Sequence, residues 1–414
     1  MPDSEHRLAG LDLIRGIAVL GIALMNVASF ALPPAAYDNP VAYGPASPRD
    51  LAIWAIEFLL VDGKLRALFS MLFGASLLLV ADRAEAGGRD PGTVHVRRML
   101  WLLVIGLLHA LLIWPGDILV MYALVGLAAF TFRDKPITAL LVAAAMCLVA
   151  QMAAAAVALV DLGALRAAAA APHAPAAARA AWAATLDALG PRRADAATPA
   201  MRLHDAGYGA VLADRLAQGW STRVAQLEEA GLETLGFVLI GMAGLRSGAL
   251  AAAWPRRRYA RIAIACTAIG IAGEVALLGW CFASGLDPVT LSAAAILGGA
   301  PLRPLLALGY AALALLLASQ GALAMRLRAV GRMALSGYVG TSILFSLLFD
   351  GYGLGLYGRL TRAELLLPVA MLWLGLLLAC PLWLRHFRHG PLEWLWRSLA
   401  RGAAQPMRRK AIAI

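Results

Sequence analysis

The hydrophobic positions of this chain occur in long continuous runs and do not alternate with polar ones. Several runs hold about 20 residues, the length that an α-helix needs to cross a hydrocarbon layer of ~30 Å. They are rich in Leu, Ala and Gly and show no period of two, so strands are not indicated. The pattern predicts an all-α fold, a polytopic bundle of membrane helices.

We expect about ten transmembrane helices, over residues 11–32, 64–81, 97–114, 117–132, 136–160, 232–250, 261–283, 304–323, 333–350 and 364–384. These spans divide the chain into an N-terminal membrane half (1–160, five spans), an Ala-rich segment (161–231), a C-terminal membrane half (232–384, five spans) and a basic tail (385–414). The tail predicts an interfacial helix, because it places apolar and basic side chains close together on one short segment.

The basic residues between the runs predict the orientation. The loops on one side hold 13 basic residues: Arg83, Arg89, Arg97, Arg98, Arg133, Lys135, Arg256, Arg257, Arg258, Arg261, Arg326, Arg328 and Arg332. The short loops on the other side hold 3: Arg49, Arg359 and Arg362. Since short cytoplasmic loops are enriched in Lys and Arg, we expect both termini inside and residues 161–231 to form a helical periplasmic segment.

Composition agrees with a multi-pass membrane protein. Of the 414 residues, 61% are hydrophobic and 15% are charged, outside the range of soluble domains. The net charge of +11 follows the topology of the inner loops and tail, so we expect the lipid bilayer as a partner and no nucleic acid. The four cysteines are not spaced like zinc ligands, and no metal is expected.

Three polar side chains lie deep inside the predicted spans. A rise of ~1.5 Å per residue places Asn26, His109 and Glu274 ~16 to 20 Å from the basic inner ends of their helices. All three therefore fall in the outer half of the bilayer. Ionisable groups at that depth are expensive and mark functional sites.

The chain resembles a known family along nearly its whole length. The stretches that carry the resemblance are RLAGLDLIRGIAVLGIALMN, DGKLRALFSMLFGASL, RRMLWLLVIGLLHALLIWPGDILVMYALVGL, GRMALSGYVGTSIL, FDGYGLGLYGRL and RHGPLEWLWR. They are similar to the YeiB-like family of bacterial inner-membrane proteins, a domain of unknown function. In the first span, the pattern R-x-x-x-L-D-x-x-R-G makes this family similar to transmembrane acyltransferases, including heparan glucosaminide N-acetyltransferase.

The resemblance implies transfer of an acyl group from cytoplasmic acyl-CoA, such as acetyl-CoA, to an outer glycan, lipid or small metabolite. Asp12 and Arg15 share one helix face beside Arg97 and Arg98, and such arginines could grip phosphates with forked donors. These four residues are the candidate cofactor-binding group, although the same arginines also serve topology.

His109 is the candidate general base, because neutral imidazole takes a proton readily near pH 7. Asp117, after the Pro115–Gly116 corner, or Glu274 could hold the imidazole in one tautomer. His109 could instead bond helices together and Asp117 could cap a helix. An unpaired carboxylate in the membrane is costly, so Glu274 is expected to be neutral or paired with His109 or an arginine.

Three further residues are candidates for substrate binding. Lys64 and Arg66 are either anchors that reach to the outer surface or contacts for an anionic acceptor. Asn26 is either a helix-bonding residue or a substrate contact. Two other functions remain open: a proton-coupled transporter or exporter in which His109 and Glu274 relay protons, and a non-catalytic envelope protein.

Overall fold

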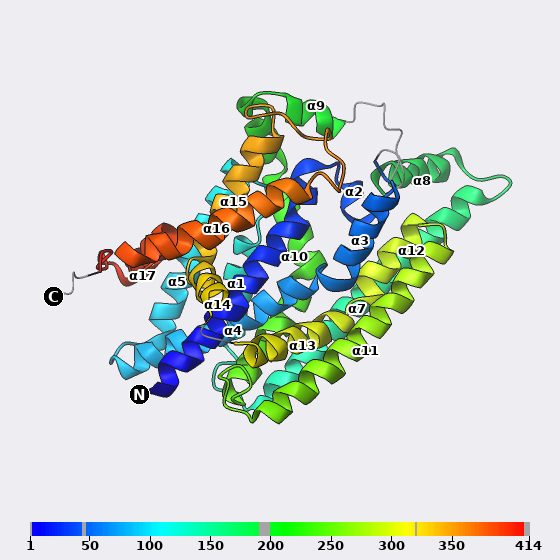
Figure 1. The fold of residues 1–414 in the computed structure, drawn as a ribbon. Helices are drawn as coiled ribbons and strands as arrows, with labels where there is room; N and C mark the ends of the chain where they lie inside the picture. Colours follow the sequence, from blue (N-terminus) through cyan, green and yellow to red (C-terminus); the bar gives the residue numbers. More distant parts are fainter. Residues whose placement is uncertain (1, 44–46, 190–198, 319–320, 410–414) are drawn as a thin grey trace.

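The computed structural model describes residues 2–43, 47–189, 199–318 and 321–409, and every regular element within them is a helix (Figure 1). The expected all-α fold is therefore confirmed. The helices are α1 (Pro2–Ala31), α2 (Ala35–Asp38), α3 (Pro48–Leu60), α4 (Lys64–Ala86), α5 (Pro91–Leu112), α6 (Leu119–Phe130), α7 (Ile137–Ala170), α8 (Ala176–Leu189), α9 (Pro199–Asp205), α10 (Tyr208–Arg246), α11 (Arg256–Ala283), α12 (Pro288–Ser292), the π-helix η1 (Ala293–Gly298), α13 (Leu302–Leu316), α14 (Ala322–Arg332), α15 (Ala334–Phe349), α16 (Leu366–His386) and α17 (Pro391–Arg401).

Between six and eight segments of the described chain are long and apolar enough to cross a membrane. The higher number counts two broken pairs as one span each: α12 and η1 with α13, bent by 56°, and α14 with α15, bent by 82°. The stretch expected at 117–132 is α6, an apolar helix of 12 residues. The structure therefore supports a multi-pass membrane protein, and the count of ten stays a prediction.

The segment expected at 161–231 is continuous with its neighbours at both ends. Helix α7 runs on to Ala170, and α10 begins at Tyr208 and passes without a break into the expected span at 232–250. Ala, Leu, Glu and Arg all have high helix propensities, so a helix can continue beyond the end of an apolar run. In Figure 1, α8 and α9 lie at the end of the bundle away from the N-terminus.

Two helix crossings depend on pairs of glycines. A Cβ atom at Gly16 of α1 would lie 2.0 Å from the Leu327 carbonyl oxygen, and one at Gly331 of α14 would lie 1.9 Å from the Asp12 carbonyl oxygen. Helices α4 and α10 meet in the same way through Gly74 and Gly241. Small residues allow helix backbones to touch, which favours packing inside a membrane.

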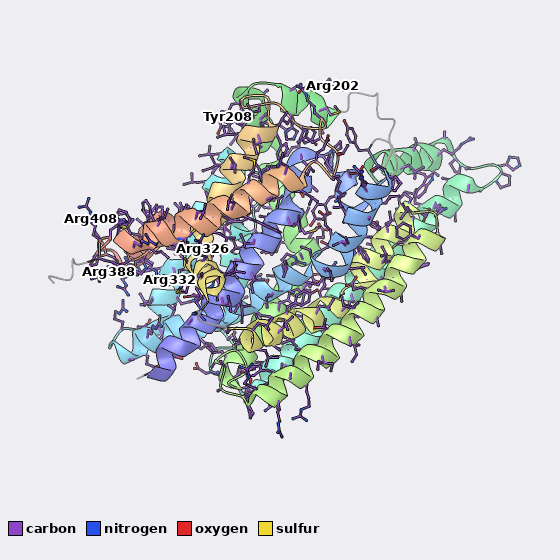
Figure 2. The ribbon with its side chains drawn as sticks, in the orientation of Figure 1. Arg202, Tyr208, Arg326, Arg332, Arg388 and Arg408 are labelled. Carbon is purple, nitrogen blue, oxygen red and sulfur yellow. The ribbon has the colours of Figure 1, made fainter. Side chains whose placement is uncertain are left out.

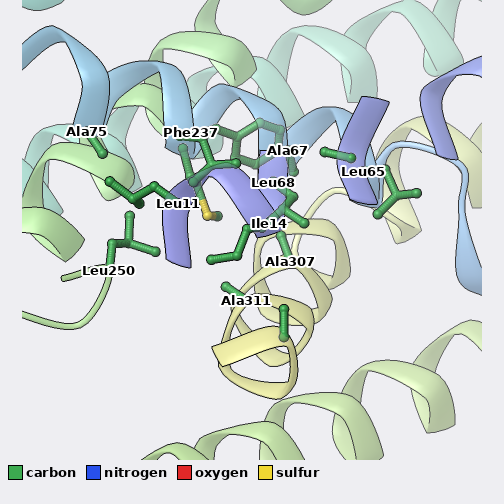
Figure 3. Packing of buried hydrophobic residues seen from close by; sticks show 14 of the residues in the cluster. Leu11, Ile14, Leu65, Ala67, Leu68, Ala75, Phe237, Leu250, Ala307 and Ala311 are labelled. Atoms are coloured by element: carbon green, nitrogen blue, oxygen red, sulfur yellow. The ribbon is translucent and has the colours of Figure 1, made fainter. Parts of the chain in front are cut away.

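The main apolar core fixes α1 and α4 against α10 and α13. Leu11 and Ile14 of α1 pack with Leu68 of α4, Phe237 of α10 and Ala307 of α13 (Figure 3). Because these five side chains are almost fully buried, α1 and α4 have little freedom to shift. Both helices form walls of the cavity described next.

Candidate functional site

A cavity of about 350 Å³ lies among α1, α4, α5, α6, α14, α15 and α17. Its lining includes Leu11, Asp12, Arg15, Val19, Ile22, Ala23, Asn26, Phe69, Phe73, Ser76, Leu77, Leu79, Val80, Arg83, His95, Arg98, Met99, Leu102, Ile118, Leu119, Tyr122, Gly331, Arg332, Ala334, Leu335, Tyr338, Thr341, Ser342, His389, Glu393, Trp396 and Arg397. Most of these side chains are apolar, and the charged ones come from α1, α4, α5, α14 and α17. The space suits a molecule with an anionic head and a narrow, less polar arm.

Five guanidinium groups surround one end of the cavity, which we call the arginine mouth: Arg15, Arg83, Arg98, Arg332 and Arg397. Arg15 donates to Asp12 Oδ1 at 2.7 Å and to Ser76 Oγ at 3.1 Å, which holds it at the wall. The Arg98 guanidinium lies 4.1 Å from the ring centre of Trp396. Figure 2 shows Arg332 at the end of α14, below Tyr208 and Arg202, which lie near the top of the view.

The two carboxylates of this lining do not neutralise the mouth. Asp12 is engaged by Arg15, and Glu393 accepts bonds from the backbone nitrogens of Leu335 at 2.7 Å and Ser336 at 3.0 Å. Glu393 thus caps the first turn of α15 and fastens α17 over the cavity. The remaining guanidinium groups leave the mouth with excess positive charge, which attracts phosphate.

The pKa of His389, in the turn before α17, is affected by this positive charge. Burial, followed by the charges of Arg397 and Arg332, lowers its pKa to about 4. The imidazole is therefore neutral near pH 7 and adds no positive charge to the mouth. Burial and the neighbouring Arg401 likewise lower the pKa of Arg397. Both shifts have the direction that burial and neighbouring cations produce in a basic side chain.

The opposite end of the cavity is bounded by Asn26, Ile118 and Tyr338. Asn26 lies ~16 Å along α1 from Arg15. His109 lies directly behind this wall, with its ring centre 5.1 Å from that of Tyr338. The Tyr338 hydroxyl accepts a hydrogen bond from the Ile118 backbone nitrogen at 3.3 Å, so one side chain contacts both the cavity and the histidine.

His109 and Asp117 form a buried dyad. His109 Nδ1 lies 2.8 Å from Asp117 Oδ1, and the two residues are 2% and 1% exposed. Asp117 Oδ2 also accepts from the Val120 backbone nitrogen at 2.8 Å. Asp117 therefore caps the first turn of α6 and binds His109, one oxygen for each. His109 Nε2 is buried and has no hydrogen-bond partner within the described part of the chain.

The turn that carries Asp117 is held by α10. Arg223 donates to the backbone oxygen of Asp117 at 3.2 Å and to that of Pro115, while Gln226 reaches Pro115 at 3.3 Å. Sequence reasoning missed Arg223, because it lies in the segment assigned to the periplasm and more than 100 residues from its partners. No local spacing could have found it.

The predicted pairing of Glu274 with His109 or an arginine is wrong. Glu274 forms a buried ion pair with Lys64 at 2.8 Å, not with His109 or an arginine. Lys64 begins α4 immediately after the Gly63 turn, and this start aims its side chain at α11. Arg66, two residues further along α4, pairs with Glu233, which also binds Arg303 at 2.7 Å. Lys64, Arg66 and Glu274 thus form ion pairs between helices and do not line the cavity.

The cavity lining includes most of the candidates for cofactor binding. Asp12, Arg15 and Arg98 line the mouth, and Asn26 lines the other end. Arg97 is exposed and is not part of the lining, because adjacent residues on a helix point about 100° apart. Sequence reasoning did not assign Tyr338, His389 or Arg397 to the site, although all three lie in the C-terminal motifs that carried the family resemblance.

These C-terminal motifs match a known family. Residues 245–403 match the family described as protein of unknown function, DUF418. The "Uncharacterized protein YeiB" of Escherichia coli is 33% identical over 415 residues, covering 97% of this chain and 98% of that protein. The chain belongs to the YeiB-like family. The "Uncharacterized protein YxaH" of Bacillus subtilis is 30% identical over 430 residues, covering 98% of this chain and 97% of that protein.

Membership confirms the resemblance to the YeiB-like family that the sequence motifs indicated. The α14, α15 and α17 walls of the cavity fall within the matched family region, and the dyad falls within the length shared with YeiB. No solved structure matches this chain.

Proposed function

We propose that this YeiB-like protein is a membrane acyltransferase that uses cytoplasmic acyl-CoA, such as acetyl-CoA, and acylates an outer glycan, lipid or small metabolite. In this proposal ten helices span the bacterial inner membrane and both termini lie in the cytoplasm. The observation that carries the proposal is the cavity itself. It joins a mouth of five guanidinium groups to a wall directly in front of a buried His–Asp dyad.

The length of the cavity suits the pantetheine arm of a coenzyme A thioester. Its phosphates would bind Arg15, Arg98 and Arg397 with charge-assisted bonds. The ~16 Å from Arg15 to Asn26 equals the length of about five extended peptide units, at ~3.3 to 3.6 Å each, and a pantetheine arm has a similar reach. The thioester carbon would then lie beside Tyr338.

The dyad supplies the base. An Nδ1–H bond to Asp117 Oδ1 fixes the neutral tautomer of His109 that leaves the Nε2 lone pair unprotonated. Nε2 takes the proton of the acceptor hydroxyl or amine as that group attacks the thioester carbon. The carbon–sulfur bond breaks, and the thiolate recovers the proton from the imidazolium. A swing of the Tyr338 side chain opens the wall between cavity and dyad.

The test compares three proteins in an acyl-CoA consumption assay. His109→Ala should lower turnover by about 10² to 10⁴, the usual contribution of a general base. His109→Gln keeps a hydrogen-bonding group but cannot take the proton, so it should be nearly as inactive while melting close to the parent. A Gln variant with normal turnover would refute the catalytic role.

The donor site and topology have separate tests. Arg15→Ala should weaken coenzyme A binding, and added salt should weaken it further in the parent protein. A reporter fused after Ala184 should lie in the periplasm and one fused at Ile414 in the cytoplasm. Both reporters on one side would contradict the ten-span arrangement.

One observation favours a transporter as the second candidate. Helices α14 and α15 form a broken pair, and Gly331 and Arg332 at the break line the cavity. Broken helices at a central cavity are typical of transporters. Uptake of a coenzyme A-like anion into sealed vesicles, with no consumption of thioester by the purified protein, would support this alternative.

A further inference from the structure

Three faces run along the first half of α10, from Tyr208 to Gly231. One face packs on the protein: Val211, Arg215 and Arg223 are buried, and Gly219 approaches the Leu111 side chain. A second face is polar and exposed, with Gln218, Ser221, Glu228 and Glu229. The third face is apolar and exposed, with Leu216, Trp220, Val224 and Leu227.

The third face is compact and strongly exposed. At 100° per residue its four side chains fall within an arc of about 80°. Trp220 is 79% exposed and Leu216 is 60% exposed. Large apolar side chains gathered on one exposed arc, next to a polar arc, are the pattern of a helix at the boundary of a bilayer.

This face continues the exposed apolar surface of a candidate span. Helix α5 is a candidate span with most of its length unburied, and Leu100, Val104, Leu108 and Leu112 form an exposed apolar stripe along it. The Tyr208 hydroxyl and Arg215 of α10 bind the Leu112 carbonyl oxygen at 2.9 Å and 3.3 Å. The Arg215 end of the apolar face of α10 therefore lies beside the last turn of α5, where Leu108 and Leu112 are exposed.

We propose that the apolar face formed by Leu216, Trp220, Val224 and Leu227 is buried in phospholipid acyl chains of the leaflet on the dyad side. This part of α10 lies outside every span expected from the sequence. The polar face with Gln218 and Ser221 then meets the headgroups and water. Since Arg223 on the same helix holds the Pro115–Asp117 turn, the dyad lies below the membrane surface. The inference does not depend on acyl transfer.

The experiment measures which solvent meets each face. The four native cysteines are first replaced, and single cysteines are placed at Trp220, at Ser221 as the polar control and at Leu108 as the lipid-facing control. Each is labelled with a nitroxide in proteoliposomes, and its collisions with oxygen, which concentrates in lipid, and with a water-soluble nickel chelate are compared.

The Trp220→Cys label should show an oxygen-to-nickel ratio several-fold above that of Ser221→Cys and close to that of Leu108→Cys. A ratio at Trp220 as low as that of a water-exposed label, and far below that at Leu108, would show a face open to water. Exclusion of both reagents from Trp220 would show a protein cover, such as a second copy of this chain. Either result would overturn the proposal. Lipids that carry a nitroxide at known positions along their chains then calibrate the ratio, which gives the depth of the label at position 220.

Discussion

Gly331→Ala should damage the arginine mouth through one added methyl group. The new Cβ atom would lie 1.9 Å from the Asp12 carbonyl oxygen and 2.8 Å from the Gly16 backbone nitrogen. The first distance is about 1.5 Å short of an ordinary contact, and both neighbours are backbone atoms that cannot rotate away. Helix α14 must therefore move from α1, and overpacking of this kind costs about 1 to 3 kcal/mol.

Alanine also favours a helix over glycine by about 1 kcal/mol, which offsets part of that cost. The net loss should still be measurable as a lower melting temperature in detergent. Because Arg15 and Asp12 lie at this crossing, coenzyme A binding should weaken as well. The matched control is Gly340→Ala on α15, where a Cβ atom meets nothing within 4 Å. A Gly331→Ala protein as stable as Gly340→Ala, with unchanged binding, would refute this account of the crossing.

Three further predictions concern polar groups. Lys64→Ala should destabilise the protein by about 3 to 5 kcal/mol because it leaves Glu274 buried and unpaired, whereas Lys64→Met with Glu274→Leu should regain most of that stability in the same melting assay. His389 has a pKa of about 4 in the folded protein, against an ordinary value of 6.5. As the pH falls from 6.5 to 4, the unfolded chain binds a proton at this residue before the folded protein does, so the stability of the fold decreases. The stability of His389→Gln should therefore decrease less over the same pH range. Arg223→Met should lower stability by about 1 to 3 kcal/mol, because the Asp117 carbonyl loses its bond to Arg223 and the Pro115 carbonyl keeps only Gln226. Loss of turnover beyond the loss of folded protein would show that Arg223 positions the dyad.

The sequence predicts the parts of this structure that depend on nearby residues. Apolar runs predict helices because length and hydropathy act within one segment. The contact of His109 with Asp117 can be predicted for the same reason, because the two residues are eight positions apart and a Pro–Gly corner lies between them. The break between α14 and α15 has no such signal, because Gly331 serves a crossing with a helix some 300 residues away.

Ion pairs show where sequence reasoning stops. The depth of Glu274 correctly indicates that it needs a partner, but several cations lie at similar depth, and only the packing of α4 on its neighbours selects Lys64. Arg223 is a harder case. Its position in a mixed, polar segment indicates solvent, whereas its guanidinium is buried against a turn from another part of the chain.

The contacts of His109 weigh against a purely structural role. A buried polar atom without a partner costs about 1 to 3 kcal/mol, so a histidine that only bonds helices together is most stable when both ring nitrogens are bonded. Here one nitrogen is fixed by Asp117, whose other oxygen already caps α6, and Nε2 has no partner among the described residues. Asp117 could perform the capping alone, so the cap does not require an imidazole. A fixed tautomer with a free Nε2 behind a cavity wall is the arrangement that a general base requires.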